Sequence, residues 1–272
     1  MKKNIITRNS ISQRTNPYIV RISAQKGGVG KTTVAVNLAI AMKMRGYLTL
    51  LVDADTSNPA IGIHLGLDYV NAGFIDHVRG RASTESVVVT HAPSGLAVIC
   101  GSITNAAFML TYKEAKTSYD ELKKSRYDLI VIDTEPGYVH DVVTEGINET
   151  IIVSNPDMPS YISALRISEY FSSKGILNSM VVNRVAGKRH EISSREIIEN
   201  FNGKVGFLPE DDIVPISIAA KTPAVMLNPK SKFSKAIDEI ADDLSSRIGM
   251  PLDNDVVYGY KAGKKRIFGS KR

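Results

Sequence analysis

A nine-residue stretch near the start of the chain carries residue types that bind phosphate. It runs from Gln25 to Thr33 and reads Gln-Lys-Gly-Gly-Val-Gly-Lys-Thr-Thr. Glycines let successive backbone N–H groups turn towards an anion, and a helix that starts after them adds the positive end of its dipole. Lys31 would then reach the β- and γ-phosphates of a nucleotide, and the Thr32 hydroxyl would bind Mg²⁺. An ordinary glycine-rich turn is the alternative, but it would not require the apolar run before the stretch or the helical pattern after it.

Two groups of carboxylates follow later apolar runs. Asp53 and Asp55 come directly after residues 50–52, and Asp133 ends a second run. Because the carboxyl ends of parallel strands gather ligands at one edge of a sheet, we expect these side chains to face the phosphate loop. An aspartate there can bind Mg²⁺ through water, and the N–H of Gly137 can sense the γ-phosphate. The first aspartate pair could instead cap a turn.

Apolar runs alternate with helical patterns along most of the chain, which indicates an α/β fold with a mostly parallel central sheet covered by helices on both faces. Near-continuous apolar content, as in Leu129-Ile-Val-Ile132, fits strands that are buried on both faces. The expected strands are 18–24, 48–53, 96–99, 129–133, 150–154, 180–183 and 204–207, and the expected helices are 31–45, 117–125, 160–173, 193–200 and 231–247.

Composition limits the class of protein. The 272 residues, 43% of them hydrophobic, are enough for one domain with a substantial core. No apolar run reaches membrane-spanning length and no signal peptide is visible, so we expect a cytoplasmic protein. A single cysteine, Cys100, excludes a disulfide framework and a Cys-x-x-Cys metal site.

The net charge of +6 comes from the two ends of the chain. Ten of the 34 lysines and arginines lie in residues 1–17 and 261–272, which leaves 24 basic residues against 28 acidic ones elsewhere. We expect residues 1–17 to be a disordered basic extension, with a regulatory arm as the alternative. Residues 18–248 would form the folded domain, and residues 249–272 would form a basic tail.

The phosphate loop resembles the deviant Walker A box of the MinD/ParA family of dimerising ATPases, in the stretch Lys26-Gly-Gly-Val-Gly-Lys-Thr-Thr33. The resemblance covers roughly residues 18–248 and implies a three-layer P-loop NTPase fold, ATP/ADP and Mg²⁺ as cofactors, and an ATP-dependent homodimer. In that family the leading lysine contacts the nucleotide of the partner subunit, a role the resemblance implies for Lys26. A cation placed from outside can neutralise charge during phosphoryl transfer. A lysine that only adds charge to its own loop is the alternative.

The resemblance also assigns roles further along the chain. It implies that Asp55 positions the attacking water and that Asp53 supports the metal-side network. Val181-Val-Asn-Arg-Val185 resembles the adenine-side motif, in which the asparagine reads the base edge, and a carboxamide suits this because it both donates and accepts. The stretch from Phe207 to Ser217 resembles the loop that closes over the base and leads into a short helix. The expected catalytic residues are Lys26, Lys31 and Asp55; the expected nucleotide-binding residues are Gly27, Gly28, Val29, Gly30, Lys31, Thr32, Thr33, Asp53, Gly137, Asn183, Arg184, Pro209 and Glu210; and the expected metal-binding residues are Thr32 and Asp133.

Two positions depart from the usual patterns. Gln25 stands where the ordinary phosphate loop has a glycine, and Glu135 stands where the family has a proline after the second aspartate motif. Glu135 could slow phosphate binding, pair with a basic residue or face solvent, and these alternatives stay open.

The end of the chain resembles the basic, aromatic membrane-targeting tip of MinD proteins. Ile267 and Phe268 could enter the acyl boundary of an anionic membrane through residues 261–272, with each flanking cation contributing about 1 kcal/mol. Dimerisation would double this weak attachment. Gly263 and Gly269 lower helix propensity, so a disordered basic tail is the alternative.

The function implied by the resemblance is a MinD-type switch. It would hydrolyse ATP to ADP and phosphate to control peripheral attachment at the inner face of the cell membrane and intracellular positioning, such as division-site placement, with an unidentified activator or cargo. A ParA-like partition ATPase that binds DNA nonspecifically is the alternative, because Gln25-Lys26 resembles ParA loops and basic ends suit phosphate backbones. A P-loop tyrosine kinase is a further alternative on account of Tyr258 and Tyr260.

Overall fold

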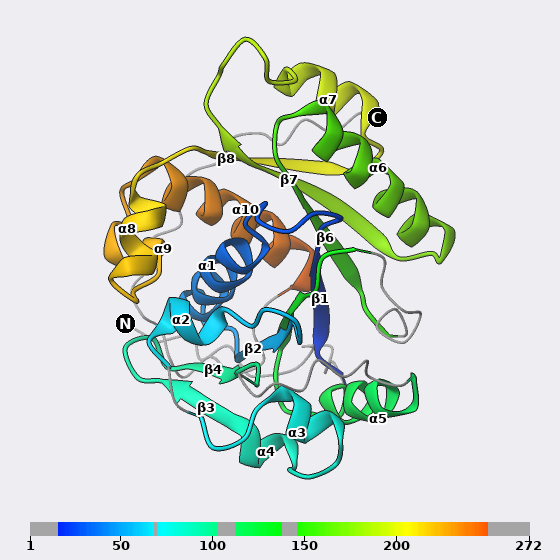
Figure 1. Ribbon diagram of the computed structural model, residues 1–272, viewed down its shortest axis with the longest axis vertical. Coiled ribbons are helices and arrows are strands. Elements are labelled where there is room, and N and C mark those ends of the chain that lie inside the picture. Colours follow the sequence, from blue (N-terminus) through cyan, green and yellow to red (C-terminus); the bar gives the residue numbers. More distant parts are fainter. Residues whose placement is uncertain (1–15, 68–69, 103–111, 138–145, 250–272) are drawn as a thin grey trace, which may run out of the picture.

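An eight-stranded sheet forms the centre of the computed structural model, which describes residues 16–67, 70–102, 112–137 and 146–249 (Figure 1). The strand order is β3-β4-β2-β5-β1-β6-β7-β8, and every neighbouring pair is parallel except β3 and β4. The strands are β1 (Tyr18–Ser23), β2 (Thr49–Ala54), β3 (Val88–His91), β4 (Leu96–Ile99), β5 (Leu129–Thr134), β6 (Glu149–Ser154), β7 (Leu177–Val185) and β8 (Lys204–Pro209).

Helices cover both faces of this sheet, so the predicted α/β fold is confirmed (Figure 1). Alternate residues of each central strand face opposite layers: Val20 packs in the core beneath α1 and α10, whereas Ile19 packs in the core beneath α3 and α5. A third hydrophobic cluster packs α6 and α7 against β6, β7 and β8. The helices are α1 (Lys31–Met44), α2 (Ile61–Leu65), α3 (Phe74–Val78), α4 (Thr84–Val87), α5 (Tyr112–Leu122), α6 (Met158–Ser173), α7 (Ser194–Asn200), α8 (Ile213–Ala219), α9 (Ala224–Leu227) and α10 (Lys232–Ile248).

The chain between β2 and β4 differs most from the sequence prediction. The edge strand β3 and the helices α2, α3 and α4 were not predicted, because each spans only four or five residues and shows too few repeats of a hydrophobic period. The predicted helix at 117–125 lies instead at Tyr112–Leu122.

The two ends of the chain lie almost entirely outside the described residues. Only Asn16 and Pro17 of the N-terminal extension and Gly249 of the tail belong to the described part, so the expected disordered extension and membrane-targeting tip are untested. No helix in the described ranges has both the length and the apolar character needed to cross a bilayer.

Candidate functional site

The loop between β1 and α1 has a backbone that only glycine suits at position 30. Gly30 has φ +98°, and a Cβ on it would lie 2.3 Å from Nδ2 of Asn183. That amide nitrogen donates a hydrogen bond of 2.8 Å to the carbonyl of Val29. The close approach of Asn183 therefore fixes the shape of the loop at the start of α1.

Three side chains of the predicted phosphate-binding stretch take different positions. Lys31 and Thr33 are buried at the first turn of α1, whereas Lys26 is exposed on the loop. The hydroxyl of Thr32 donates a 2.5 Å hydrogen bond to Oδ2 of Asp133 at the end of β5. The predicted metal-binding pair, Thr32 and Asp133, is thus in direct contact.

One carboxylate oxygen of Asp133 has no partner within the part of the chain that the structure describes. The residue is 1% exposed, and among the described residues nothing donates a hydrogen bond to its Oδ1. Burial raises the pKa of Asp133 to about 6, against the opposing effects of the Thr32 hydrogen bond and the charge of Lys31. A buried, unpaired carboxylate oxygen beside a threonine hydroxyl suits a hard divalent cation, so this donor pair fits Mg²⁺.

Asp53 lies opposite Asp133 on the neighbouring strand β2. Its Oδ2 accepts from the backbone N–H of Ile61 at 3.0 Å, and its Oδ1 accepts from that of Asp55 at 3.3 Å. Burial, with the charge of Asp133, raises the pKa of Asp53 to about 7. Asp53 thus holds the start of α2 beside the predicted metal pair.

Asp55 caps its own turn. Its Oδ1 accepts hydrogen bonds from the hydroxyl of Ser57 at 2.7 Å, the N–H of Asn58 at 2.8 Å and the N–H of Ser57 at 3.2 Å. The turn-capping alternative therefore describes these contacts, while the predicted role of positioning water stays a prediction.

The segment after β5 is held by internal hydrogen bonds. The N–H of Gly137, expected to sense the γ-phosphate, donates to the carbonyl of Ala24 at 2.9 Å. The exposed carboxylate of Glu135 accepts a hydrogen bond from the hydroxyl of Thr56. The sequence left three roles open for Glu135, and none of them included this contact with the loop after β2.

The expected adenine side lies at the ends of β7 and β8. Asn183 is buried, and one of its N–H groups is used by Val29. Arg184 is exposed, with φ +60°. Pro209 lies opposite Val185 in the sheet, and the N–H of Glu210 donates to the Val185 carbonyl at 3.0 Å. These residues share one edge with the phosphate loop, which is the placement the resemblance implies.

A buried arginine behind the loop was missed by the sequence prediction. Arg21 is 1% exposed; its Nε donates to the Ser23 hydroxyl at 2.8 Å, and an Nη donates to that of Thr134 at 3.3 Å. Burial lowers the pKa of Arg21 to about 10, so it stays charged at neutral pH. The signal was one arginine inside the apolar strand Tyr-Ile-Val-Arg-Ile-Ser. Arg21 links the strand that enters the phosphate loop to the residue after Asp133.

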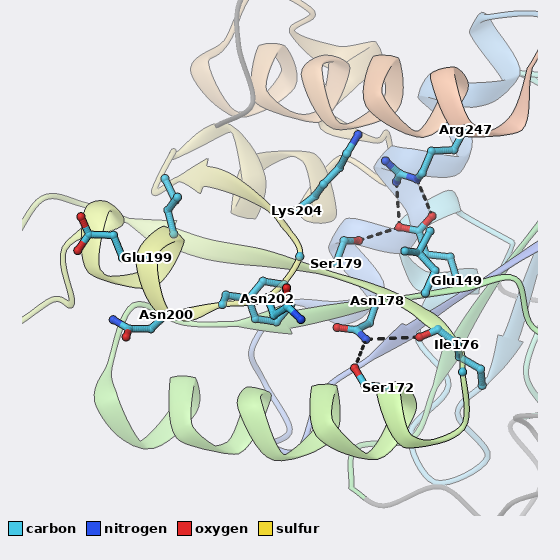
Figure 2. Close-up of a pocket in the computed structure, with 15 residues that line it drawn as sticks. Glu149, Ser172, Ile176, Asn178, Ser179, Glu199, Asn200, Asn202, Lys204 and Arg247 are labelled. Carbon is cyan, nitrogen blue, oxygen red and sulfur yellow. Dashed lines mark hydrogen bonds and ion pairs between the residues drawn. The ribbon is translucent and has the colours of Figure 1, made fainter. Parts of the chain in front are cut away.

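A cavity of about 800 Å³ lies away from the phosphate loop, at the opposite ends of β6, β7 and β8 (Figure 2). Polar groups at this cavity bond one another: the buried Asn178 side chain accepts from Ser168 and donates to Ser172 and to the Ile176 carbonyl. Because the Asn178 side chain already has its hydrogen-bond partners within the protein, we assign the functional site to the phosphate-loop edge, where Oδ1 of Asp133 has none among the described residues.

Comparison with known proteins identifies the family. Residues 18–166, more than half of the chain, match the AAA domain family. The septum site-determining protein MinD of Thermotoga maritima is 26% identical over 255 residues, which cover 88% of this chain and 92% of that protein.

Solved structures share the fold. The septum site-determining protein MinD of Pyrococcus horikoshii, complexed with Mg-ADP, superposes with a TM-score of 0.80 at 24% identity, covering 86% of this chain and 98% of that one. A ParA family ATPase of Chlorobium tepidum gives 0.72 at 21% identity, covering 82% and 98%. The predicted P-loop NTPase fold is therefore confirmed, and ATPases of this kind use a nucleotide with Mg²⁺. The chain belongs to the AAA domain family and is a member of the MinD/ParA family of P-loop ATPases.

Proposed function

We propose that this protein is an ATP-dependent switch of the MinD type. It hydrolyses ATP to ADP and phosphate slowly, dimerises in the ATP state, and so times its attachment to a surface. The observation that carries the proposal is the buried Oδ1 of Asp133, which lacks a partner among the described residues beside the Thr32 hydroxyl. A carboxylate kept in this state at the end of β5, in contact with the phosphate loop through Thr32, suits a metal-bound nucleotide.

The residues of the loop divide the work of phosphoryl transfer. Residues 27–33 surround the phosphates with backbone N–H groups, and Lys31 adds a fixed positive charge at the first turn of α1. Thr32 and Asp133 hold Mg²⁺, which when bound neutralises charge on the β- and γ-phosphates. Catalysis is then positioning and charge neutralisation, with no covalent intermediate on the protein.

Asp55 and Lys26 act only when ATP is bound. Asp55 orients the attacking water once its turn rearranges, and Gly137 exchanges its bond to Ala24 for one to the γ-phosphate. The exposure of Lys26 supports its contact with the nucleotide of a second copy across the dimer interface.

On the adenine side, Asn183 with Arg184 and the loop at Pro209 and Glu210 surround the base. The shared edge of the sheet supports this, because β7 and β8 end beside the phosphate loop.

The surface to which the dimer attaches is a membrane in this proposal. The supporting observation is the basic sequence of residues 261–272, with Ile267 and Phe268 among its cations. Residues 18–248 form the ATPase domain, residues 1–17 a basic extension and residues 249–272 the tail of a protein that works peripherally at the cytoplasmic face. The similarity to a ParA family ATPase favours DNA as the second candidate surface.

Light-scattering mass with ADP and with ATP tests the switch. The Asp55→Ala variant is used to prevent turnover, and the same samples are then floated on anionic vesicles, intact or lacking residues 261–272. A dimer that forms only with ATP, and floats only when the tail is present, supports the membrane switch. A dimer that stays off vesicles but binds DNA in a salt-dependent way supports the second candidate, and no dimer contradicts the proposal.

A further inference from the structure

The loops after β2 and β5 leave the sheet side by side. These strands are parallel neighbours, with Ala54 opposite Thr134 as the last registered pair. The next residues along each strand therefore emerge at the same edge, and there the Thr56 hydroxyl donates to the carboxylate of Glu135. This hydrogen bond joins the segment that carries Asp55 to the segment that carries Gly137.

Both segments are held in place by bonds within the protein. On one side, Oδ1 of Asp55 accepts three hydrogen bonds from its own turn. On the other, the N–H of Gly137 donates to the Ala24 carbonyl. The contact between Thr56 and Glu135 links these two arrangements, so one loop can move relative to the other only if this contact breaks.

Charge is the second observation. Four carboxylates stand at the ends of these two adjacent strands, and two of them, Asp53 and Asp133, are buried opposite each other in the sheet register. The terminal phosphate of ATP adds negative charge at this edge that ADP does not bring. Like charges at short range disfavour each other, and an exposed carboxylate held in place by a hydroxyl keeps its charge near one position. The four residues are Asp53, Asp55, Asp133 and Glu135.

We propose that Glu135, held by Thr56, sets the preference of this site between nucleotides by opposing the γ-phosphate and so favouring ADP over ATP. The inference rests on the proposed nucleotide-binding function and assigns a role to the residue that replaces the proline of the family pattern. Glu135 acts here as a specificity residue. The ATP state is reached when binding energy elsewhere in the loop exceeds the cost of displacing this carboxylate.

The test compares dissociation constants for ADP and for a non-hydrolysable ATP analogue, both with excess Mg²⁺, by titration calorimetry. Glu135→Gln removes the charge and keeps the shape, while Thr56→Val removes the hydroxyl and leaves the charge. We expect Glu135→Gln to strengthen ATP-analogue binding relative to ADP by about tenfold. Thr56→Val should shift the same ratio by about threefold, and the double variant should not exceed Glu135→Gln.

Glu199→Gln is the matched control, because Glu199 is also a carboxylate that accepts a hydrogen bond at the surface but lines the cavity at the opposite end of the sheet (Figure 2). It should leave the ratio unchanged. An unchanged ratio in Glu135→Gln, or a ratio that moves towards ADP, overturns the inference. An unchanged ratio in Thr56→Val overturns the part played by the hydroxyl. A wild-type protein that binds neither nucleotide contradicts the proposed function instead.

Discussion

Two buried carboxylates at opposite edges of the sheet, those of Glu149 and Asp133, differ in how many hydrogen bonds they accept. Glu149, at the start of β6, is fully buried and accepts two hydrogen bonds of 2.9 Å from Arg247 and one of 2.8 Å from Ser179 (Figure 2). It also accepts one of 3.2 Å from Tyr18. Asp133, at the end of β5, accepts one side-chain hydrogen bond from the described residues, that of Thr32 to its Oδ2.

The difference separates structural from functional use of charge. A buried carboxylate whose oxygens are all paired anchors the elements that pair with it, here the last turn of α10 and the first residues of β6 and β7. A buried carboxylate with an unpaired oxygen lowers the stability of the protein without a ligand and keeps a position for a cation. Asp133 therefore lowers the stability of the ligand-free protein at one edge of the sheet, whereas Glu149 raises it at the other.

The largest expected effect is at Glu149. Glu149→Gln removes the fully buried charge that pairs with the partly buried guanidinium of Arg247, which keeps its ion pair with Asp243, so the free energy of unfolding in urea should fall by about 3 kcal/mol. Glu199→Gln, at the same end of the sheet, should change it by less than about 0.5 kcal/mol because its pair with Arg195 is exposed. Equal effects of the two substitutions would contradict the structural role of Glu149.

The pH dependence of stability should come from the other edge. The folded-state pKa values of Asp133 and Asp53 are raised, to about 6 and about 7, so the folded protein binds protons more tightly than the unfolded chain. Their destabilising effect is fully present above pH 7 and is relieved as the pH falls from about 7 to about 4. We therefore expect these groups to make the nucleotide-free protein more stable as the pH falls over this range.

Urea unfolding at pH 7.5 and pH 5 measures this change. The Asp133→Asn variant should gain less than the wild type on acidification, because one of the two titrating groups is gone. The same gain in both proteins would show that Asp133 is not one of the groups responsible.

The stability of the phosphate-loop edge should also depend on the absence of a side chain at Gly30. Gly30→Ala places a Cβ against the Asn183 side chain at a positive φ and should lower the free energy of unfolding by about 1–2 kcal/mol. Gly27→Ala is the matched control for stability, because a Cβ added at Gly27 would have no atom of the described residues within 4 Å apart from its chain neighbours. Thermal unfolding of both variants measures the difference, and equal melting temperatures would contradict a loop shaped by Asn183.

The smallest expected effect on stability is at Asp133 itself. Asp133→Asn removes a buried charge that has one unpaired oxygen, so the free energy of unfolding without ligand should stay within about 1 kcal/mol of the wild-type value or rise. Urea unfolding in the absence of Mg²⁺ measures it. A loss of stability as large as that of Glu149→Gln would show that Asp133, like Glu149, stabilises the fold, and would contradict the comparison.

Sequence reasoning was most successful where a local pattern determines the structure. The central strands and the start of α1 follow from long apolar runs and from the glycines of the loop, and the contact of Thr32 with Asp133 follows from the shared carboxyl edge. The short elements between β2 and β4 were missed because four residues hold too little periodic signal.

The contacts that the sequence did not predict depend on pairing between distant residues. In the sequence, Arg21 is a single charged residue within an apolar strand. Only the structure shows that its guanidinium is hydrogen-bonded to Ser23 and Thr134. The link between Thr56 and Glu135 joins residues 79 positions apart through the register of two strands, which no local pattern reports.

The dependence of ADP binding on Mg²⁺ tests the central claim most directly. Titration calorimetry would compare the wild type with Asp133→Asn, with and without Mg²⁺. Mg²⁺ should strengthen ADP binding to the wild type at least about tenfold, and Asp133→Asn should lose most of that gain while its stability without ligand is preserved. A variant that keeps the full gain from Mg²⁺ would contradict the assignment of the unpaired oxygen of Asp133 to a metal.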